Sequence, residues 1–322
     1  MSSNTPKQPQ RDLRFFLTVP HACSYLEGRQ ATTLFLDPQE APNSGVYDAL
    51  ALLGFRRSGS HLYRPHCGDC RACISVRVPI ADFTPNRTQK KLLKRNADLT
   101  IEEGPALFDP EHYRLYAHYI RSRHADGDMF PPSHEQYRTF LTSRDEYARL
   151  ISFRLDGRLV AVAAMDRMSH GLSAIYTFYD PDEAFQSRSL GTYAVLWQIE
   201  QARREALAHL YLGYWIRDCR KMNYKQHFQP LEYLDGSHWR RRIPFSFHDT
   251  HLPLSLIKFY RSCGLPTSAQ GAYNLASTLP CCRPCGTISP IEVPNPALFC
   301  ARMARNPPHY SLYQMRISLY GA

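Results

Sequence analysis

The chain has 322 residues, of which 43% are hydrophobic and 21% are charged, and its formal net charge is +10 at neutral pH. This length fits two or three folded units of about 100–200 residues, and the composition is that of a globular protein with a buried core. No apolar run reaches the roughly 18–20 residues of a membrane span, and the polar start lacks a signal peptide. Ten cysteines in such a chain do not indicate a disulfide framework. We therefore expect a cytoplasmic monomer that contacts no membrane.

Four stretches of the chain differ in character and predict its organisation. Residues 1–13 read as a disordered leader, and residues 14–99 as a smaller domain with cysteines and a basic helix. Residues 100–246 alternate strands and helices. Residues 247–322 hold nine of the 24 prolines and five of the ten cysteines, and we expect a poorly ordered tail there. From Thr250 to the end, six Lys and Arg against one acid supply half of the net charge, so global charge is weak evidence for a nucleic-acid partner.

The first chemically informative group is a set of cysteines in the N-terminal domain. Cys67, Cys70 and Cys73 follow one another at intervals of three residues, so a turn can direct their sulfurs toward one ion. Zinc and iron–sulfur clusters take four protein ligands, and Cys23 is the natural fourth. Reduced, unliganded thiols in a packed loop would have the same spacing. Cys219 has charged neighbours and is expected at the surface.

A basic helix is predicted from Thr88 onward. Its apolar residues, Leu92 and Leu93, can face the core, while the cations gather on the other side. Such a face suits a phosphate backbone, although solvated basic helix faces are common. The five cations lie within nine residues and are Arg87, Lys90, Lys91, Lys94 and Arg95.

Residues 100–246 show the clearest alternation of elements. Tyr113, Tyr116 and Ile120 fall on one helix face, Ser133 with Gln136 resembles a capping box, and Asp156-Gly157 is a hairpin turn. The sequence predicts helices over 111–124, after 133 and over 193–208, and strands over 149–155, 159–165, 172–179 and 209–216. This pattern favours a mixed α/β (α+β) fold.

Two places in this half can hold a ligand. The first is the loop from Arg188 to Gly191 and Thr192, because free N–H groups and a positive dipole end at a helix start attract phosphate or carboxylate. An ordinary capped helix is the alternative. The second is the strand with Gly213, where Tyr214 and Trp215 can stack on a base or can pack in the core.

Several segments together resemble the bacterial N-end-rule aminoacyl-tRNA–protein transferases. The resemblance covers roughly residues 12–239, with the motifs in the same order, and it is strongest to the aspartate/glutamate leucyltransferases, relatives of the eukaryotic arginyltransferases. Leu26 stands where a second cysteine of the first pair would align. The matching segments are 20–29, 63–77, 87–99, 119–129, 177–181, 188–193, 211–224 and 228–232.

The resemblance implies an acetyltransferase-like (GNAT-like) C-terminal domain that holds the aminoacyl end of a tRNA. Leucyl-tRNA would donate leucine to proteins that begin with Asp or Glu and so mark them for degradation; arginyl-tRNA is the alternative donor. In the eukaryotic relatives, cysteines of the N-terminal unit bind a metal or iron–sulfur cluster, and the resemblance extends this expectation to Cys23, Cys67, Cys70 and Cys73.

From residue type and placement we assign candidate roles. Asp180 or Tyr179 would orient or deprotonate the acceptor amine. Arg188 with Gly191 and Thr192 would hold the terminal adenosine, and Tyr214 and Trp215 the substrate. Arg77 and Arg123 would read the acceptor carboxylate, and the five cations listed above would bind tRNA. Aminolysis of an activated ester needs positioning and a proton acceptor, so the reaction itself requires no cofactor.

Two other functions fit parts of the sequence. An acetyl-CoA-dependent N-acetyltransferase would need a fuller glycine-rich loop than residues 187–192 provide. A zinc-ribbon RNA-binding adaptor would explain the cysteines and the basic helix, but it would not need the large α/β half.

Overall fold

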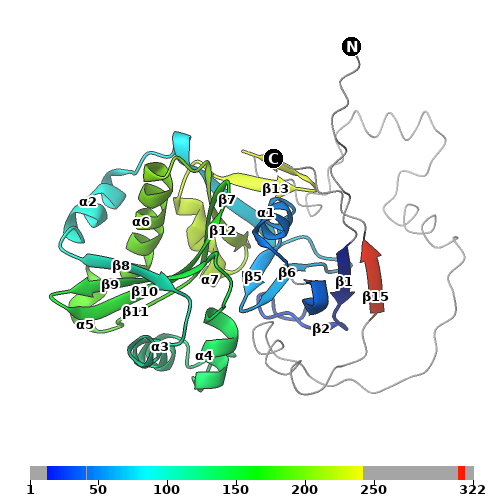
Figure 1. Ribbon diagram of the computed structural model, residues 1–322, viewed down its shortest axis with the longest axis horizontal. Coiled ribbons are helices and arrows are strands. Elements are labelled where there is room, and N and C mark those ends of the chain that lie inside the picture. Colours follow the sequence, from blue (N-terminus) through cyan, green and yellow to red (C-terminus); the bar gives the residue numbers. More distant parts are fainter. Residues whose placement is uncertain (1–12, 41, 242–310, 316–322) are drawn as a thin grey trace, which may run out of the picture. The chain divides into compact units, whose positions relative to one another are not determined.

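The computed structural model describes residues 13–40, 42–241 and 311–315 (Figure 1). The strands are β1 (Leu13–Leu17), β2 (His21–Ala22), β3 (Gln30–Ala31), β4 (Thr33–Leu36), β5 (Arg56–Ser58), β6 (His61–Pro65), β7 (Ile74–Pro79), β8 (Thr100–Pro105), β9 (Ala148–Leu155), β10 (Arg158–Met168), β11 (Gly171–Tyr179), β12 (His209–Trp215), β13 (Glu232–Asp235), β14 (His238–Arg240) and β15 (Ser311–Met315). The helices are α1 (Ser44–Leu52), α2 (Arg87–Arg95), α3 (Pro110–Arg123), α4 (His134–Leu141), α5 (Glu183–Gln186), α6 (Leu190–Arg204) and α7 (Arg220–Asn223), with short 3-10 turns at Pro38–Glu40, Ile80–Asp82 and Tyr224–His227.

Local sequence signals placed most elements of the C-terminal half correctly. The Asp156-Gly157 turn joins β9 to β10 with both residues at positive φ, as a two-residue hairpin of this kind requires. Ser133 caps α4 by accepting from the Gln136 amide at 3.1 Å. Helix α6 begins at Leu190, three residues before the predicted start, so Gly191 lies within its first turn rather than in a loop.

The larger sheet has eight strands in the order β14-β13-β7-β12-β11-β10-β9-β8. All neighbouring pairs are antiparallel except β11 and β12, which run parallel. Their pairing is short: it joins residues 171–173 of β11 to residues 209–211 of β12. Beyond this, β12 has a bulge before Gly213, whose φ is +80°. The two strands therefore separate toward their C-terminal ends, next to the start of α6.

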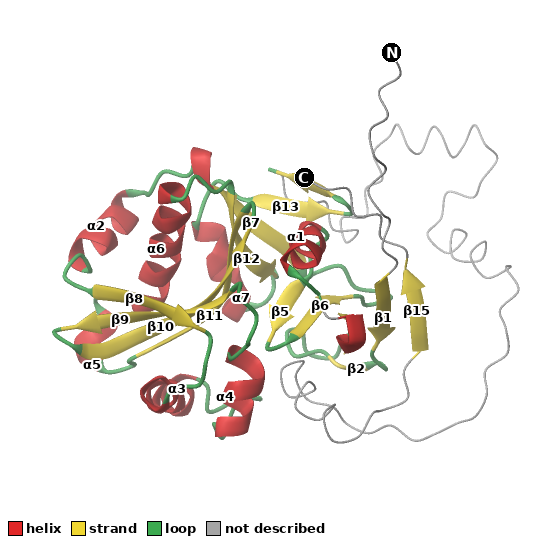
Figure 2. Ribbon diagram, in the orientation of Figure 1, coloured by secondary structure: helices red, strands yellow, loops and turns green. Residues whose placement is uncertain are grey.

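Helices cover both faces of this sheet, and the alternation along each strand divides its side chains between two cores (Figure 2). On β10, Val162 and Ala164 belong to the core beneath α1, α3 and α4, whereas Ala161 and Ala163 belong to the core beneath α2 and α6. The predicted mixed α/β fold class is confirmed at this level: a large, mostly antiparallel sheet with helices on its two faces.

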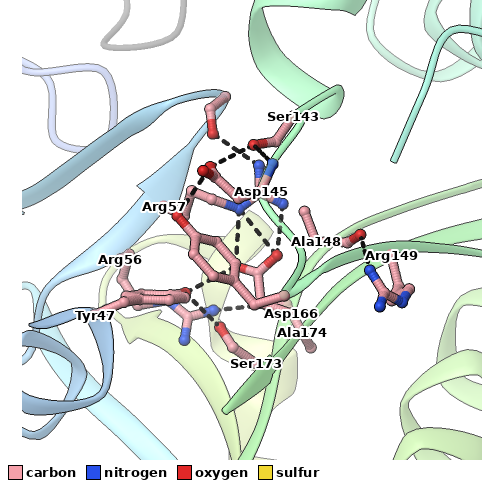
Figure 3. A network of polar contacts seen from close by, with 12 residues as sticks. Tyr47, Arg56, Arg57, Ser143, Asp145, Ala148, Arg149, Asp166, Ser173 and Ala174 are labelled. Atoms are coloured by element: carbon pink, nitrogen blue, oxygen red, sulfur yellow. Dashed lines mark hydrogen bonds and ion pairs between the residues drawn. The ribbon is translucent and has the colours of Figure 1, made fainter. Parts of the chain in front are cut away.

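The smaller sheet follows the order β15-β1-β4-β6-β5, and its edge strand β5 packs against β11 of the larger one. Arg57 of β5 forms a fully buried ion pair with Asp166 of β10, with Nη2 to Oδ1 at 2.7 Å, and Tyr47 donates to the same carboxylate at 2.8 Å (Figure 3). At the turn after β5, Gly59 lies so close to α4 that a Cβ would stand 1.8 Å from the Thr139 carbonyl oxygen.

The sheets do not follow the predicted boundary at residue 99. Strand β7 and helix α2, predicted within the N-terminal domain, belong to the larger sheet and its helical layer. The sheet boundary therefore lies between β6 and β7, because β7 pairs with β12 and β13, which come much later in the chain.

Most of the predicted leader and tail lies outside the described residues. Five tail residues are described, and they form β15, which pairs antiparallel with β1. This pairing differs from the expected absence of structure there. No helix in the described ranges combines the length and apolar character that crossing a membrane requires.

Candidate active site and cysteine cavity

The end of β11 meets the start of α6, as the predicted strand–loop–helix requires. Gly191 packs against the ring of Tyr179: a Cβ at position 191 would stand 3.0 Å from Cε1 of that ring. Tyr179 also lies 4.9 Å, centroid to centroid, from Tyr119 of α3. Burial raises the pKa of the Tyr119 hydroxyl, which therefore stays protonated. The structure thus brings together the predicted pair from β11 and α6.

Asp180 follows β11 directly and is buried, with 4% of its surface exposed. Its carboxylate pairs with Arg158 at 2.5 Å and accepts from the Asp182 amide at 3.1 Å. His118 of α3 lies 3.1 Å from Asp182 and 4.0 Å from Asp180. Hydrogen bonding to His118 lowers the pKa of Asp182. Asp180 is therefore part of a charged cluster beside the β11 terminus.

Arg188 does not point into open space at the helix start. Its guanidinium makes a bidentate pair with Asp98, both distances being 2.8 Å, and also donates to the Arg95 carbonyl. Arg95 in turn donates to the Ser187 carbonyl. These contacts tie the segment before α6 to the C-terminal end of α2, and Ser189, at the N-cap position, makes no side-chain capping bond.

The basic helix forms as predicted. Asn86 and Gln89 close a reciprocal capping box at its start, and Leu92 and Leu93 pack against the core. All five predicted cations are exposed: Arg87, Lys90, Lys91, Lys94 and Arg95. The exposed side of α2 is therefore a continuous cationic surface.

The two arginines predicted to read an acceptor carboxylate differ in their surroundings. Arg77 of β7 is buried, pairs with Glu232 at 2.7 Å and stacks on Trp239 at 4.3 Å. Arg123 lies exposed at the end of α3, close enough to Tyr119 to influence its pKa. Arg77 thus has its counter-ion already, whereas Arg123 faces solvent.

Tyr214 and Trp215 lie in the core rather than on a surface where a base could stack. The Tyr214 hydroxyl lies within hydrogen-bond distance of the Gly54 and Tyr63 carbonyls, at 3.0 and 3.1 Å. Trp215 Nε1 donates to Asn223 at 3.1 Å. Both rings are more than nine-tenths buried, so the structure supports the packing alternative.

The four cysteines predicted as a set line one cavity between the β2–β3 hairpin and the loop before β7. Its walls also include Tyr25, Tyr63 and Tyr214, and the thiols are Cys23, Cys67, Cys70 and Cys73. Burial, and then the neighbouring thiols, raise the pKa of Cys73 to about 12. A bound cation would offset this by stabilising the thiolates.

The geometry of the thiols tests the fit of one ion. Groups of three or more His, Cys, Asp or Glu side chains could hold a metal ion. Among the described residues, only His118, Asp180 and Asp182 form such a group with all ligand atoms within 4.8 Å of one another. The cysteine sulfurs are therefore spaced more widely than the shell of a single zinc ion, although they surround one space. Cys219, expected at the surface, is buried.

Two buried cations without a described carboxylate partner, Arg56 and Lys225, were given no role from the sequence. Arg56 of β5 donates to the Ala174 carbonyl of β11 at 2.6 Å (Figure 3), and Lys225 donates to the Tyr214 carbonyl of β12 at 2.5 Å. Both lie where β11 and β12 separate. A basic residue gives no local signal that its charge will be buried, so only the tertiary structure identifies these two.

Comparison with known proteins places the chain in a family. Residues 21–91 match the family model described as the N terminus of arginine-tRNA-protein transferase, and residues 111–235 match the model of its C terminus. An aspartate/glutamate leucyltransferase of Chromohalobacter salexigens is 73% identical over 244 residues, which are 76% of this chain and 99% of that protein. A protein of the same name from Marinobacter nauticus is 55% identical over 71% of this chain and 96% of its own length.

Solved structures show weaker similarity. L-PGS from Bacillus licheniformis is 12% identical with a TM-score of 0.34, over 45% of this chain and 46% of that one. FemX is 12% identical with a TM-score of 0.37, over 58% and 65%. The two family models and the extent of identity to the relatives lead to one conclusion: the chain belongs to the aminoacyl-tRNA–protein transferase family that includes the aspartate/glutamate leucyltransferases.

Proposed function

We propose that this protein transfers leucine from leucyl-tRNA to the N-terminal Asp or Glu of acceptor proteins and thereby marks them for degradation in the cytoplasm. The observation that carries this proposal is the 73% identity to an aspartate/glutamate leucyltransferase across 99% of that relative. The described part of the chain also holds an exposed cationic helix that suits an RNA partner.

The reaction is the aminolysis of an ester. The acceptor's α-amine attacks the carbonyl carbon at the tRNA 3′ end, and an amide bond forms as the C–O bond to the ribose breaks. The amine loses one proton, and the released ribose oxygen gains one to become a hydroxyl. An α-amine has a pKa of roughly 7.7–8.0, so a modest proton acceptor suffices. In the proposed arrangement, the charged cluster around Asp180 orients the amine beside Tyr179. No covalent enzyme intermediate is needed, because the ester is already activated.

The donor would bind across α2 and α6. Lys90, Lys91 and Lys94 of α2 would contact tRNA phosphates, and the first turn of α6, with Gly191 and Thr192, would receive the terminal adenosine. Binding of the aminoacyl end beside the point where β11 and β12 separate would be an acetyltransferase-like arrangement. Arg188 would act indirectly, because its pair with Asp98 fixes the segment that precedes α6.

The four cysteines would hold a zinc ion or an iron–sulfur cluster after a small rearrangement of their loops. Their shared cavity supports this proposal, and their wide spacing is the argument against it. Metal analysis of protein purified without oxygen checks it. A stoichiometric metal that is lost on replacing Cys70 and Cys73 by Ser would support the site, and metal-free, active protein would exclude it.

The decisive experiment incubates the protein with radiolabelled leucyl- or arginyl-tRNA and peptides that begin with Asp, Glu or Ala. Leucine transfer to the Asp and Glu peptides alone is the expected result. Arginine transfer instead would favour the second candidate, an arginyltransferase, which the match to the two arginine-tRNA-protein transferase family models supports. No transfer from either tRNA would contradict the proposed function.

A further inference from the structure

Four Lys or Arg side chains are buried among the described residues, and they fall into two classes. Arg57 and Arg77 have carboxylate partners, Asp166 and Glu232, each at 2.7 Å. Arg56 and Lys225, each 6% exposed, form no ion pair with a carboxylate in the described ranges. Buried charges are normally paired, because their removal from water is unfavourable without a counter-ion. In the described ranges, Arg56 and Lys225 are therefore buried cations that bond to backbone carbonyls but have no carboxylate to balance their charge.

Both cations lie at the separation of β11 and β12. The guanidinium of Arg56 occupies the space at the β12 bulge, where a Cβ on Gly213 would stand 3.4 Å from its Nε. Each cation is anchored to one of the two strands: Arg56 to the Ala174 carbonyl and Lys225 to the Tyr214 carbonyl. An anionic group held at this separation would lie near both charges.

The two cations influence one another. Burial lowers the pKa of Lys225 to about 7, and the positive charge of Arg56 is the second cause. Two like charges held together in a buried space repel each other, and an anion placed between them would relieve this repulsion. The arrangement thus favours an anionic ligand group rather than a further protein contact.

We propose that Arg56 and Lys225 bind the side-chain carboxylate of the acceptor's N-terminal Asp or Glu. This inference rests on the proposed function and replaces Arg77, which already has Glu232 as its partner. A guanidinium fork matches the two oxygens of a carboxylate, and an ammonium adds a point charge. The buried position suits a short side chain, whereas the bulky phosphate backbone of tRNA has the exposed cations of α2 available.

The test compares peptide binding and leucine transfer for peptides that begin with Asp or with Asn. Variants Arg56→Gln and Lys225→Met remove one charge each. Arg64→Gln serves as the matched control, because Arg64 lies on the neighbouring strand β6 and also bonds to a backbone carbonyl, that of Leu53, at 3.0 Å. Lys225→Arg keeps the charge. Binding is measured by calorimetry without tRNA, so this readout does not depend on transfer.

We expect each neutral variant to bind the Asp peptide about 10–100-fold more weakly, as loss of a hydrogen bond to a charged group predicts. In these variants the preference for Asp over Asn peptides should fall by the same factor, and the KM for leucyl-tRNA should not change. Lys225→Arg, which keeps the charge, should retain most of the preference for Asp. The control should behave as the wild type.

Stability supplies an independent readout. Because an unpaired buried cation destabilises the folded state, Lys225→Met should unfold at the same or a higher temperature than the wild type. A large fall in its unfolding temperature would indicate a structural role and overturn the inference. An unchanged Asp preference in both variants, or a raised KM for leucyl-tRNA alone, would also overturn it. Wild-type protein that binds Asp peptides selectively but transfers no leucine would contradict the proposed function and leave the site supported.

Discussion

At the scale of single residues, the structure separates charges that hold the fold from charges that can act on a ligand. Arg57, Arg77 and Arg188 each have a carboxylate partner, so their positive charge is already satisfied within the protein. Arg123 is exposed, and Arg56 is buried without such a partner in the described ranges. A prediction from residue type alone cannot make this distinction, because it depends on the neighbours that folding supplies.

The buried pair of Arg57 and Asp166 gives the first prediction. Arg57→Met should lower the free energy of unfolding by about 3–5 kcal/mol, because it leaves the Asp166 carboxylate buried without its counter-ion. Urea unfolding measures this. The control, Arg154→Met, removes an arginine whose partner carboxylates, Glu102 and Glu111, are more exposed, and it should change stability by less than about 1 kcal/mol. Equal effects of the two substitutions would contradict the assigned role of Arg57.

His209 gives a prediction about pH. Burial, and then the charge of Arg77, lower the pKa of His209 from 6.5 to about 4. Between these values the unfolded chain binds the proton and the folded protein does not, so stability falls as the pH falls from 6.5 toward 4. His209→Gln should therefore reduce the acid-induced fall in the free energy of unfolding by up to about 3 kcal/mol.

Thermal unfolding at a series of pH values measures the effect of His209→Gln. His238→Gln, a substitution of an exposed histidine on β14, serves as the control and should keep the wild-type pH profile. Parallel profiles for wild type and His209→Gln would show that this imidazole does not titrate as expected.

At the scale of elements, α2 combines a locally encoded start with a role that depends on its placement. The capping box of Asn86 and Gln89 can be recognised in the sequence once the helix is known, and Leu92 and Leu93 anchor its inner side. The lysines on its other side are exposed to an external partner, and its end is joined to the segment before α6 through Asp98 and Arg188. The helix thus connects the proposed tRNA surface to the proposed site of the aminoacyl end.

Replacing Lys90, Lys91 and Lys94 together by Gln should weaken tRNA binding and reduce its dependence on salt. Each lost phosphate contact reduces the magnitude of the negative slope of log K against log salt concentration by about 0.7–0.9. For three lysines, the magnitude of the slope should fall by roughly two to three. Filter binding at several salt concentrations measures it. The control replaces Arg114, Arg121 and Arg144, which are exposed and come from α3 and the segment after α4. An unchanged slope in the lysine variant would exclude the assigned role of α2.

At the scale of the whole molecule, the smaller sheet is fixed against the larger sheet and α4 by β5. The backbone of Gly59 touches α4 directly: its amide donates to the Phe140 carbonyl at 2.9 Å, and its φ is +58°. A side chain here would collide with the helix backbone, which cannot move aside as a flexible side chain can. The position of the cysteine cavity and of Arg56 relative to β11 depends on this contact and on the buried pair of Arg57.

Gly59→Ala should therefore destabilise the protein by more than about 3 kcal/mol, since steric overlap adds to backbone strain at positive φ. Gly157→Asn is the matched control, because Gly157 also has a positive φ but its missing Cβ would meet nothing within 4 Å. Asn adopts this conformation readily, so the control should lose less than about 1 kcal/mol. Comparable losses at the two positions would show that contact with α4 is unimportant.

Elements whose signals are local can be predicted from the amino-acid order alone. The Asp156-Gly157 turn, the Ser133 cap and the spacing along α3 depend on a few neighbouring residues, so the chain encodes them before it folds. The family motifs and the cationic side of α2 are equally readable. They identify the protein as an aminoacyl-tRNA–protein transferase without reference to its shape.

Which residues meet depends on long-range packing, which the local sequence does not encode. Strand β7 joins the larger sheet because its partners β12 and β13 lie more than a hundred residues later, a choice that no local pattern encodes. The same long-range packing gives Arg77 and Arg188 their counter-ions and buries Tyr214 and Trp215. It leaves Arg56 and Lys225 together where two strands part. A side chain's chemistry comes from its type, but its availability comes from the elements packed around it.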